Sequence, residues 1–473
     1  MKEFIKSFFS FGIASTIEKL IAFVLLPVYT RYFSTSEFGV IDLIQVMLGV
    51  VAIFAHLQLE TSLQRYYYDY DGERKKSLIS TITYAIMLLS LVLVIPIMLF
   101  SRQISELMFK TAEYSNLIKW ASLQLPFTNY SMLALVILRY EKKNMQFALM
   151  VLIKVVVNVI FILVFVVWLK RGIYGVFYAQ LIAFVISSIF LFYAVKDFFV
   201  YKISSADLQK SLRYAMPQFP ARIGSIMLSY ANRFFMVGYL TISSIGIYSL
   251  SLKLASILQL VYTAFVMAWA PFMFEQQKKP GHKIVFAQAL LLTSCPVFFI
   301  VAFVSIFAKE IVQIVASKQF IDAHLYLGGL CMYFAFFIFK EIVDIGPKFT
   351  EKTKYLSYTF FLSVVINLVS LYLFIKVYGL YGVVYSMMLT NITLFIVSWL
   401  VSNSLYHIPF NIIKFVMMAL PALTVSVLSM YDVLSLPVKF ITIGAISTFY
   451  GFYFFNYLKD FKMITPSSAE NLI

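Results

Sequence analysis

The sequence predicts an all-α, polytopic membrane protein. Of its 473 residues, 62% are hydrophobic and only 13% are charged. Apolar runs recur along the chain and repeatedly reach the roughly 20 residues that a helix needs to cross a bilayer. Because lipid-exposed backbone groups must be hydrogen-bonded within their own segment, runs of this length favour helices over the shorter alternating strands of a barrel.

Fourteen transmembrane helices are expected, separated by short polar or charged stretches. The first carries Glu18 and Lys19 in its middle and has no small-residue cleavage site, so we expect a retained helix rather than a signal peptide. The spans are expected at about 7–29, 38–62, 78–100, 114–138, 148–169, 174–195, 213–239, 245–273, 284–307, 324–346, 355–376, 380–402, 411–430 and 438–457.

The distribution of basic residues predicts the orientation. With the N-terminus inside, the inner segments and adjoining helix ends hold twenty-two Lys and Arg residues, whereas the outer side holds ten. This bias places both termini in the cytoplasm. Clusters such as Arg74-Lys75-Lys76 and Lys142-Lys143 also suit the anionic headgroups of membrane lipids.

An internal repeat predicts two related bundles. Residues 172–179 (GIYGVFYA) recur as residues 379–386 (GLYGVVYS), and the same offset of 207 places Gly39 on Gly246. A duplication of six spans explains this register better than chance recurrence of Gly-x-x-Gly turns. Since six is even, the two halves share one orientation, as in transporters that rock two bundles around a central site.

The repeat sets the expected domain boundaries. We expect an N-terminal six-helix bundle at residues 1–203, a C-terminal six-helix bundle at residues 204–408, and two additional helices with a cytoplasmic tail at residues 409–473.

Arg222 and Arg233 interrupt the seventh apolar run. At helical spacing they lie along one side of the helix with other polar residues, namely Gln218, Ser225, Ser229 and Asn232. An arginine in a span costs roughly 2.5 kcal/mol or more on insertion scales unless it faces protein or water. This polar seam is therefore a candidate lining for a hydrated cavity that takes an anionic cargo. Alternatively, both arginines lie near the ends of the span and extend to the interfaces.

Other kinds of site are not indicated. Cys295 and Cys331 both lie in apolar runs without metal-ligand spacing, and the four histidines are scattered. No metal or cofactor is therefore expected. No catalytic nucleophile stands out, and no soluble region is large enough for a nucleic-acid interface.

Residues 26–39 (LPVYTRYFSTSEFG) resemble the opening of the polysaccharide-transporter branch, which contains lipid-linked oligosaccharide flippases, of the multidrug/oligosaccharidyl-lipid/polysaccharide exporter superfamily. Pro217, Asn232-Arg233 and residues 246–249 (GIYS) are similar to that branch too. The resemblance covers spans 1 to 12. In one departure, Asn232 stands where family members often have an acidic residue, so Arg233 is expected to be less neutralised.

The resemblance implies an O-antigen flippase-like transporter of the bacterial cytoplasmic (inner) membrane. Its substrate would be an undecaprenyl-diphosphate-linked oligosaccharide, moved from the cytoplasmic to the periplasmic leaflet for surface polysaccharide biosynthesis. It would work by alternating access, with polysaccharide assembly proteins as possible partners.

The polar residues fit such a substrate. Arg222 is the preferred diphosphate anchor because it is nearer the cytoplasmic side and its planar guanidinium can bind a phosphate with two hydrogen bonds. Arg233, about 16 Å further along the helix, could receive the group later. Lys19 and Lys253 could complete the positive lining, alongside Gln218 and Asn232. The alternative for the two lysines is extension to the interface, or for Lys19 a pair with Glu18.

Two acidic residues are candidates for coupling to a proton or a sodium ion. Glu18 lies in the first span and Asp344 in the tenth. Lys340 precedes Asp344 by four residues, so a structural ion pair on one helix face is favoured there over an ion site.

Two other functions stay open. A multidrug or cation exporter of the same superfamily would share the architecture but should prefer acidic cavity residues. A membrane glycan polymerase or ligase should have a long outer loop, whereas the longest outer connections here run only from about 101 to 113 and from 308 to 322.

Overall fold

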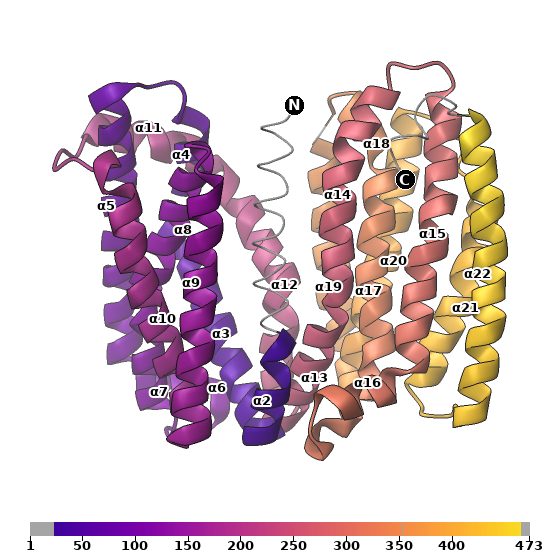
Figure 1. Ribbon diagram of the computed structural model, residues 1–473, viewed down its shortest axis with the longest axis horizontal. Helices are drawn as coiled ribbons and strands as arrows, with labels where there is room; N and C mark the ends of the chain where they lie inside the picture. The colour runs from indigo at the N-terminus through magenta and orange to yellow at the C-terminus, as the bar shows by residue number, and fades with distance from the viewer. Residues whose placement is uncertain (1–22, 353, 465–473) are drawn as a thin grey trace. The chain divides into compact units, whose positions relative to one another are not determined.

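The structure is a computed structural model that describes residues 23–352 and 354–464 (Figure 1). Over these residues all regular structure is helical and no strand is present, which confirms the all-α prediction. Twelve helical segments of this part of the chain are long and apolar enough to cross a membrane. The predicted total of fourteen is therefore not confirmed.

Two predicted spans account for the difference. The first, at 7–29, falls mostly on residues outside the described ranges. The seventh corresponds to α12 (Phe219–Tyr239), a helix of 21 residues that is not among the twelve. Its two arginines and several small polar residues lower its mean hydropathy below that of an ordinary span.

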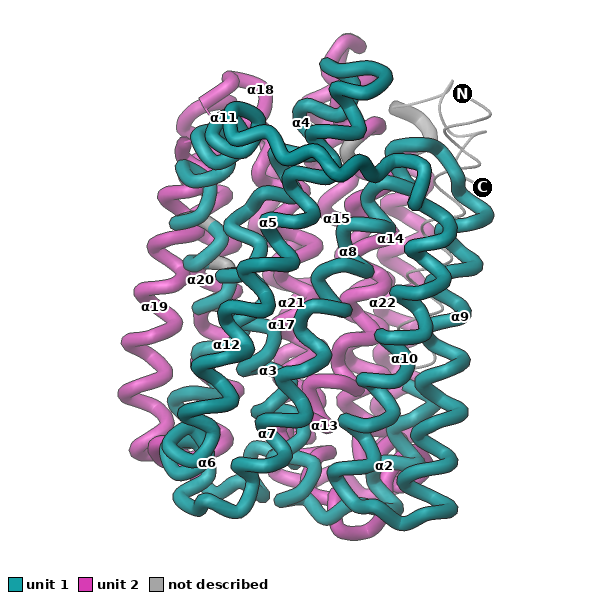
Figure 2. Tube along the Cα trace, turned by 90° about the vertical axis from the view of Figure 1, so that its left-hand side faces the viewer, with its two compact units in different colours: residues 1–237, 241–246 teal, residues 238–240, 247–473 magenta. Residues whose placement is uncertain are grey.

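The chain divides into two compact units (Figure 2). Unit 1 comprises the described residues up to 237 together with 241–246, and unit 2 comprises 238–240 and the described residues from 247 onward. Unit 1 contains α2 (Leu26–Tyr32), α3 (Thr35–His56), α4 (Leu59–Tyr66), α5 (Gly72–Leu99), α6 (Ser101–Phe109), α7 (Ser115–Ser122), α8 (Gln124–Tyr140), α9 (Asn144–Ile162), η1 (Leu163–Trp168), α10 (Gly172–Val195), η2 (Lys196–Phe198), α11 (Ser205–Ala215), η3 (Met216–Gln218), nearly all of α12, and the first turn of α13 (Ile242–Ala255).

Unit 2 continues from the rest of α13. It contains α14 (Ile257–Gln276), α15 (His282–Ile306), α16 (Ala308–Val315), η4 (Lys318–Ala323), α17 (His324–Val343), α18 (Ile345–Phe349), α19 (Lys354–Tyr378), α20 (Leu380–Leu405), α21 (Ile412–Ser429) and α22 (Leu436–Ile464).

Helix α3, which carries several residues of the candidate site, has clear start and stop signals. Ser34 and Glu37 form a capping box, in which the Ser34 amide donates to Glu37 Oε2 at 2.8 Å and the Glu37 amide donates to Ser34 Oγ at 3.2 Å. The helix ends where Leu57 and Gln58 adopt left-handed backbone conformations, with φ of 45° and 59°. The turn to α4 therefore follows directly after His56.

Each unit has its own apolar core. In unit 1, Ile79, Ile82 and Ile86 of α5 recur at helical spacing and are fully buried in one cluster with Leu133 and Ile137 of α8. In unit 2 the core is aromatic. Phe415 of α21 has its ring centroid 5.0 Å from that of Phe339 in α17 and 4.9 Å from that of Phe395 in α20.

The repeated glycines have matching local geometry. Gly172 and Gly379, which are 207 residues apart, have φ of 58° and 56°, a left-handed conformation that glycine adopts without a Cβ clash. Gly39 and Gly246 lie against each other inside unit 1. A Cβ on Gly39 would collide with the carbonyl oxygen of Ile242, and one on Gly246 with that of Thr35. The two contacts are equivalent in the repeat, since Thr35 and Ile242 are also 207 residues apart.

Candidate functional site

The two arginines of α12 lie in different surroundings within unit 1. The Arg222 side chain is exposed, and within the described part of the chain no carboxylate forms an ion pair with it. It lies close enough to His56 at the end of α3 and to Glu60 in α4 to act on both electrostatically. Arg222 is therefore a cation that is near polar groups but is not directly neutralised.

Arg233 is instead buried and paired. Its Nε donates to Asp42 Oδ2 of α3 at 3.2 Å, and its Nη1 donates to the Ser229 carbonyl at 3.1 Å. The side chains of Arg233 and Asp42 are only 9% and 7% exposed. Although Asn232 replaces the acidic residue that the family often has, Arg233 is neutralised after all. The carboxylate comes from a neighbouring helix rather than from the preceding position.

The other two predicted residues near α12 are uncharged. Gln218 is partly buried in η3 and donates through Nε2 to the Tyr214 carbonyl at 3.2 Å. Asn232 is 1% exposed, and among the described residues nothing donates a hydrogen bond to its Oδ1. A buried acceptor of this kind can take a hydrogen bond from a hydroxyl group.

The remaining residues predicted beside this group are Lys19, Glu18 and Lys253. Lys19 and Glu18 lie outside the described residues. Lys253 is partly buried in the last turn of α13 and belongs to unit 2, whereas Arg222 and Arg233 belong to unit 1.

Asp344 lies in unit 2 and forms the expected ion pair. Its Oδ2 lies 2.5 Å from Lys340 Nζ, one helical turn earlier, and its side chain is 1% exposed. Lys340 also lies 3.6 Å from Glu341, whose other carboxylate oxygen accepts from Lys348 at 3.0 Å. This charge-balanced cluster favours a structural role for Asp344, as the Lys340 spacing indicated.

Sequence reasoning missed a buried polar chain in unit 1. His56 Nε2 donates to Asn129 Oδ1 at 2.7 Å, and Asn129 Nδ2 donates to Ser90 Oγ at the same distance. All three side chains are buried and come from α3, α8 and α5.

The role of Asp42 was not predicted from the sequence either. A single acidic residue inside an apolar run was the available signal, because such residues rarely lie in spans without a partner.

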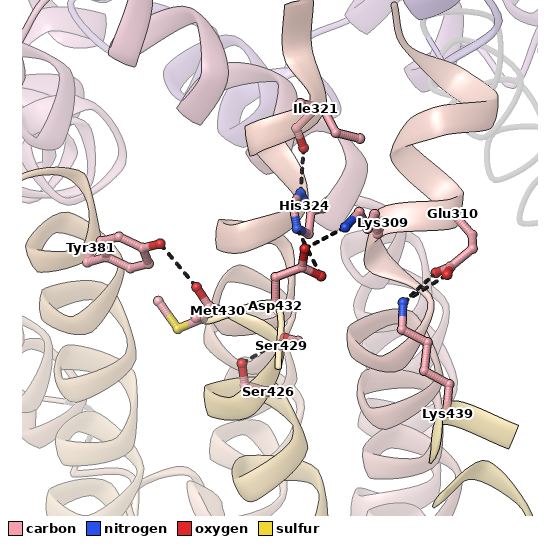
Figure 3. A network of polar contacts seen from close by, with 10 residues as sticks. All are labelled: Lys309, Glu310, Ile321, His324, Tyr381, Ser426, Ser429, Met430, Asp432 and Lys439. Atoms are coloured by element: carbon pink, nitrogen blue, oxygen red, sulfur yellow. Dashed lines mark hydrogen bonds and ion pairs between the residues drawn. The ribbon is translucent and has the colours of Figure 1, made fainter. Parts of the chain in front are cut away.

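Unit 2 has a second polar network, at the ends of α16, α17, α21 and α22 (Figure 3). Asp432 binds Lys309, and His324 Nε2 lies 3.6 Å from the other oxygen of the same carboxylate. Lys439 donates to both carboxylate oxygens of Glu310, at 2.8 and 3.0 Å. These contacts hold together the helix ends and the turns between them in unit 2. The network is therefore best explained as structural.

The comparisons with known proteins agree with the helical architecture. Residues 4–277 match the family described as "Polysaccharide biosynthesis protein". No curated protein matches the sequence.

Several solved structures share the fold. The inward closed conformation of the lipid II flippase MurJ aligns with a TM-score of 0.74 and 16% identity, covering 95% of this chain and 99% of that chain. An inward-facing multidrug resistance MATE family transporter of the MOP superfamily aligns with a TM-score of 0.63 and 16% identity, covering 85% and 95%. A MOP superfamily transporter from Pyrococcus furiosus gives 0.55 and 17%, covering 85% and 95%. At these identities the likeness shows the fold alone, which is that of MOP superfamily transporters.

Proposed function

Because the chain belongs to the polysaccharide biosynthesis protein family, we propose that it is a flippase for an undecaprenyl-diphosphate-linked oligosaccharide. It moves this substrate between the leaflets of the bacterial cytoplasmic membrane for surface polysaccharide assembly, by alternating access around a cationic central site. Both termini lie in the cytoplasm in this proposal, which follows from the bias of Lys and Arg toward one side.

The observation that carries the proposal is the state of Arg222. Buried Arg233 and partly buried Lys340 each have a carboxylate partner, at 3.2 and 2.5 Å, whereas Arg222 is exposed and forms no ion pair within the described residues. A cation left without a counter-ion in a membrane-spanning bundle attracts an anion from outside. A diphosphate suits it because a guanidinium binds two phosphate oxygens at once.

The other residues of the proposed site have separate roles. Arg233 receives the diphosphate after Arg222, and Asn232 Oδ1 accepts from a sugar hydroxyl. Gln218, Lys19 and Lys253 extend the polar lining. Glu18 is the proposed proton or sodium site, since Asp344 is already neutralised by Lys340.

The test compares two substitutions of Arg222 in reconstituted vesicles. Export of an undecaprenyl-diphosphate-linked oligosaccharide is measured as the fraction that becomes accessible in each leaflet. Arg222→Ala should lower the initial rate at least about tenfold, because one charge-assisted, two-point contact is lost. Arg222→Lys should recover only part of the rate, because one ammonium cannot reproduce the two-point contact.

A control separates a role in binding from a general effect of losing an arginine. Arg65→Ala removes an exposed arginine of the same unit whose Nη1 lies 3.1 Å from Asp69, and it should leave the rate near wild type. Full activity of Arg222→Lys or Arg222→Ala would contradict the anchor and favour extension of Arg222 to the interface.

The structural likeness to a multidrug transporter keeps one other function under consideration. A drug exporter of this fold should bind organic cations, which an unpaired arginine repels. Transport of a lipophilic cation that is unaffected by Arg222→Ala, together with no oligosaccharide export by wild type, would favour that alternative.

A further inference from the structure

Asp42 occupies the position that an anionic substrate would need at Arg233. Its Oδ2 accepts from Arg233 Nε at 3.2 Å, on the edge of the guanidinium that a phosphate oxygen would otherwise use. Both side chains are almost fully buried. An anion can bind Arg233 through this edge only if the Asp42 carboxylate moves away.

The carboxylate is held in place by its helix. Asp42 lies about one turn after Gly39, where α3 packs directly against the Ile242 carbonyl. The capping box at Ser34 fixes the start of the same helix. The hydroxyls of Thr35 and Ser243 are also 2.6 Å apart there. The backbone around Asp42 is therefore fixed at a position from which the carboxylate reaches Arg233.

This arrangement makes the two arginines unequal. Arg222 has no carboxylate to displace within the described chain, whereas Arg233 has one at hydrogen-bond distance. Displacing Asp42 breaks a buried ion pair, and that cost is subtracted from the affinity of Arg233 for any arriving anion. The contact with Asp42 therefore weakens the binding of a second anion at the same edge of Arg233.

We propose that Asp42 is a built-in competitor that releases the substrate's diphosphate from Arg233. The proposal rests on the proposed function and names a release residue that α3 contributes to the site on α12. The diphosphate binds Arg222, reaches Arg233 about 16 Å along the helix, and is displaced there as the Asp42 carboxylate re-forms its ion pair. Arg233 is then a transfer point rather than a second anchor.

The experiment measures binding and release of undecaprenyl diphosphate by the purified full-length protein in detergent. Asp42→Asn removes the competing charge but keeps the side-chain shape. It should bind the lipid about tenfold more tightly than wild type, mainly through slower dissociation. Its rate of oligosaccharide export should fall at the same time. Asp42→Glu keeps the carboxylate and should remain much closer to wild type.

Two further variants complete the test. In Asp42→Asn/Arg233→Gln the gain in affinity should disappear, because the proposed competition takes place at Arg233. Asp207→Asn, which removes another buried carboxylate of unit 1, should not tighten binding. If Asp42→Asn does not fold, Asp42→Ser removes the same charge and serves in its place.

The outcomes separate this inference from the proposed function. If wild type binds undecaprenyl diphosphate and Arg222→Ala weakens that binding, the function stands. Unchanged or weaker binding by Asp42→Asn then overturns the competitor alone. If neither wild type nor Asp42→Asn binds the lipid, both proposals are overturned.

Discussion

At the scale of single residues, Asp432 gives a measurable consequence of the unit 2 network. The hydrogen bond from Lys309 lowers the pKa of Asp432 below its ordinary value, with smaller effects of His324 and Lys439, although partial burial opposes the shift. A carboxyl with a lowered folded-state pKa stabilises the fold above its unfolded pKa of about 3.9, and that contribution is lost as the pH falls through the folded value. For a pair this exposed we expect about 1 kcal/mol or less.

Asp432→Asn should therefore lower the thermal unfolding midpoint near neutral pH, and the difference from wild type should shrink below about pH 4. Thermal unfolding in detergent, followed by intrinsic fluorescence across pH, measures this. Asp322→Asn, at an exposed aspartate nearby, should show no such pH-dependent difference. If the unfolding midpoints of Asp432→Asn and wild type differed by the same amount down to pH 3, the Lys309 contact would not stabilise the fold.

Single residues also show what the sequence can and cannot reveal. Arg222 and Arg233 stand out because each is a charge in an apolar run, and the Lys340–Asp344 pair could be predicted because a helix places residues four apart side by side. Asp42 could not be assigned to Arg233, since 191 residues separate them. Partners on different helices depend on packing that local periodicity does not encode.

At the scale of helices, the glycine contact between α3 and α13 predicts a sharp effect of a single methyl group. In Gly39→Ala the new Cβ would overlap the Ile242 carbonyl, and backbone cannot yield as a flexible side chain can. Overpacking of this kind typically costs about 1–3 kcal/mol. We expect Gly39→Ala and Gly246→Ala each to lower the unfolding midpoint by several degrees, measured by thermal shift in detergent.

Gly451→Ala is the matched control. Gly451 also lies in a helix, but a Cβ there would meet nothing within 4 Å, so alanine should be neutral or slightly stabilising. Equal midpoints for Gly39→Ala and Gly451→Ala would show that the two helix starts can separate without cost.

The same scale shows what hydropathy leaves out within a span. The predicted eighth span at 245–273 is two helices, α13 and α14, which meet at Ser256. The Ser256 hydroxyl donates to the Lys253 carbonyl at 2.6 Å, a local bond that competes with helix continuation. Short amphipathic helices such as α4 and α11 were not predicted either, because hydropathy identifies only long apolar runs. The repeated glycines, in contrast, could be recognised from the sequence. Gly172 and Gly379, which occupy equivalent positions of the repeat, have matching φ values.

For the whole molecule, the fold class could be predicted because hydropathy and segment length act on every span in the same way. The predicted number of spans is not confirmed, because the first span lies mostly outside the described residues and α12 carries polar residues that an ordinary span lacks. A functional helix is where a rule based on apolar composition should be expected to fail.

The predicted orientation can be tested on one helix. Glu73 lies at the start of α5 and is 79% exposed, and Lys110 is exposed after α6, beyond the other end of α5. The basic-residue bias places Glu73 in the cytoplasm and Lys110 outside. The two native cysteines, Cys295 and Cys331, are buried, so they should contribute little background when variants with one added cysteine are labelled by a membrane-impermeant maleimide.

In intact cells Lys110→Cys should be labelled, whereas Glu73→Cys should react only after the membrane is permeabilised. Because the two positions flank the same membrane-spanning helix, each serves as the control for the other. If only Glu73→Cys were labelled from outside, the predicted orientation of the whole molecule in the membrane would be reversed. Arg222, near the start of α12, would then lie toward the outer leaflet, and a substrate that approaches from the cytoplasm would meet Arg233 and its competitor Asp42 first.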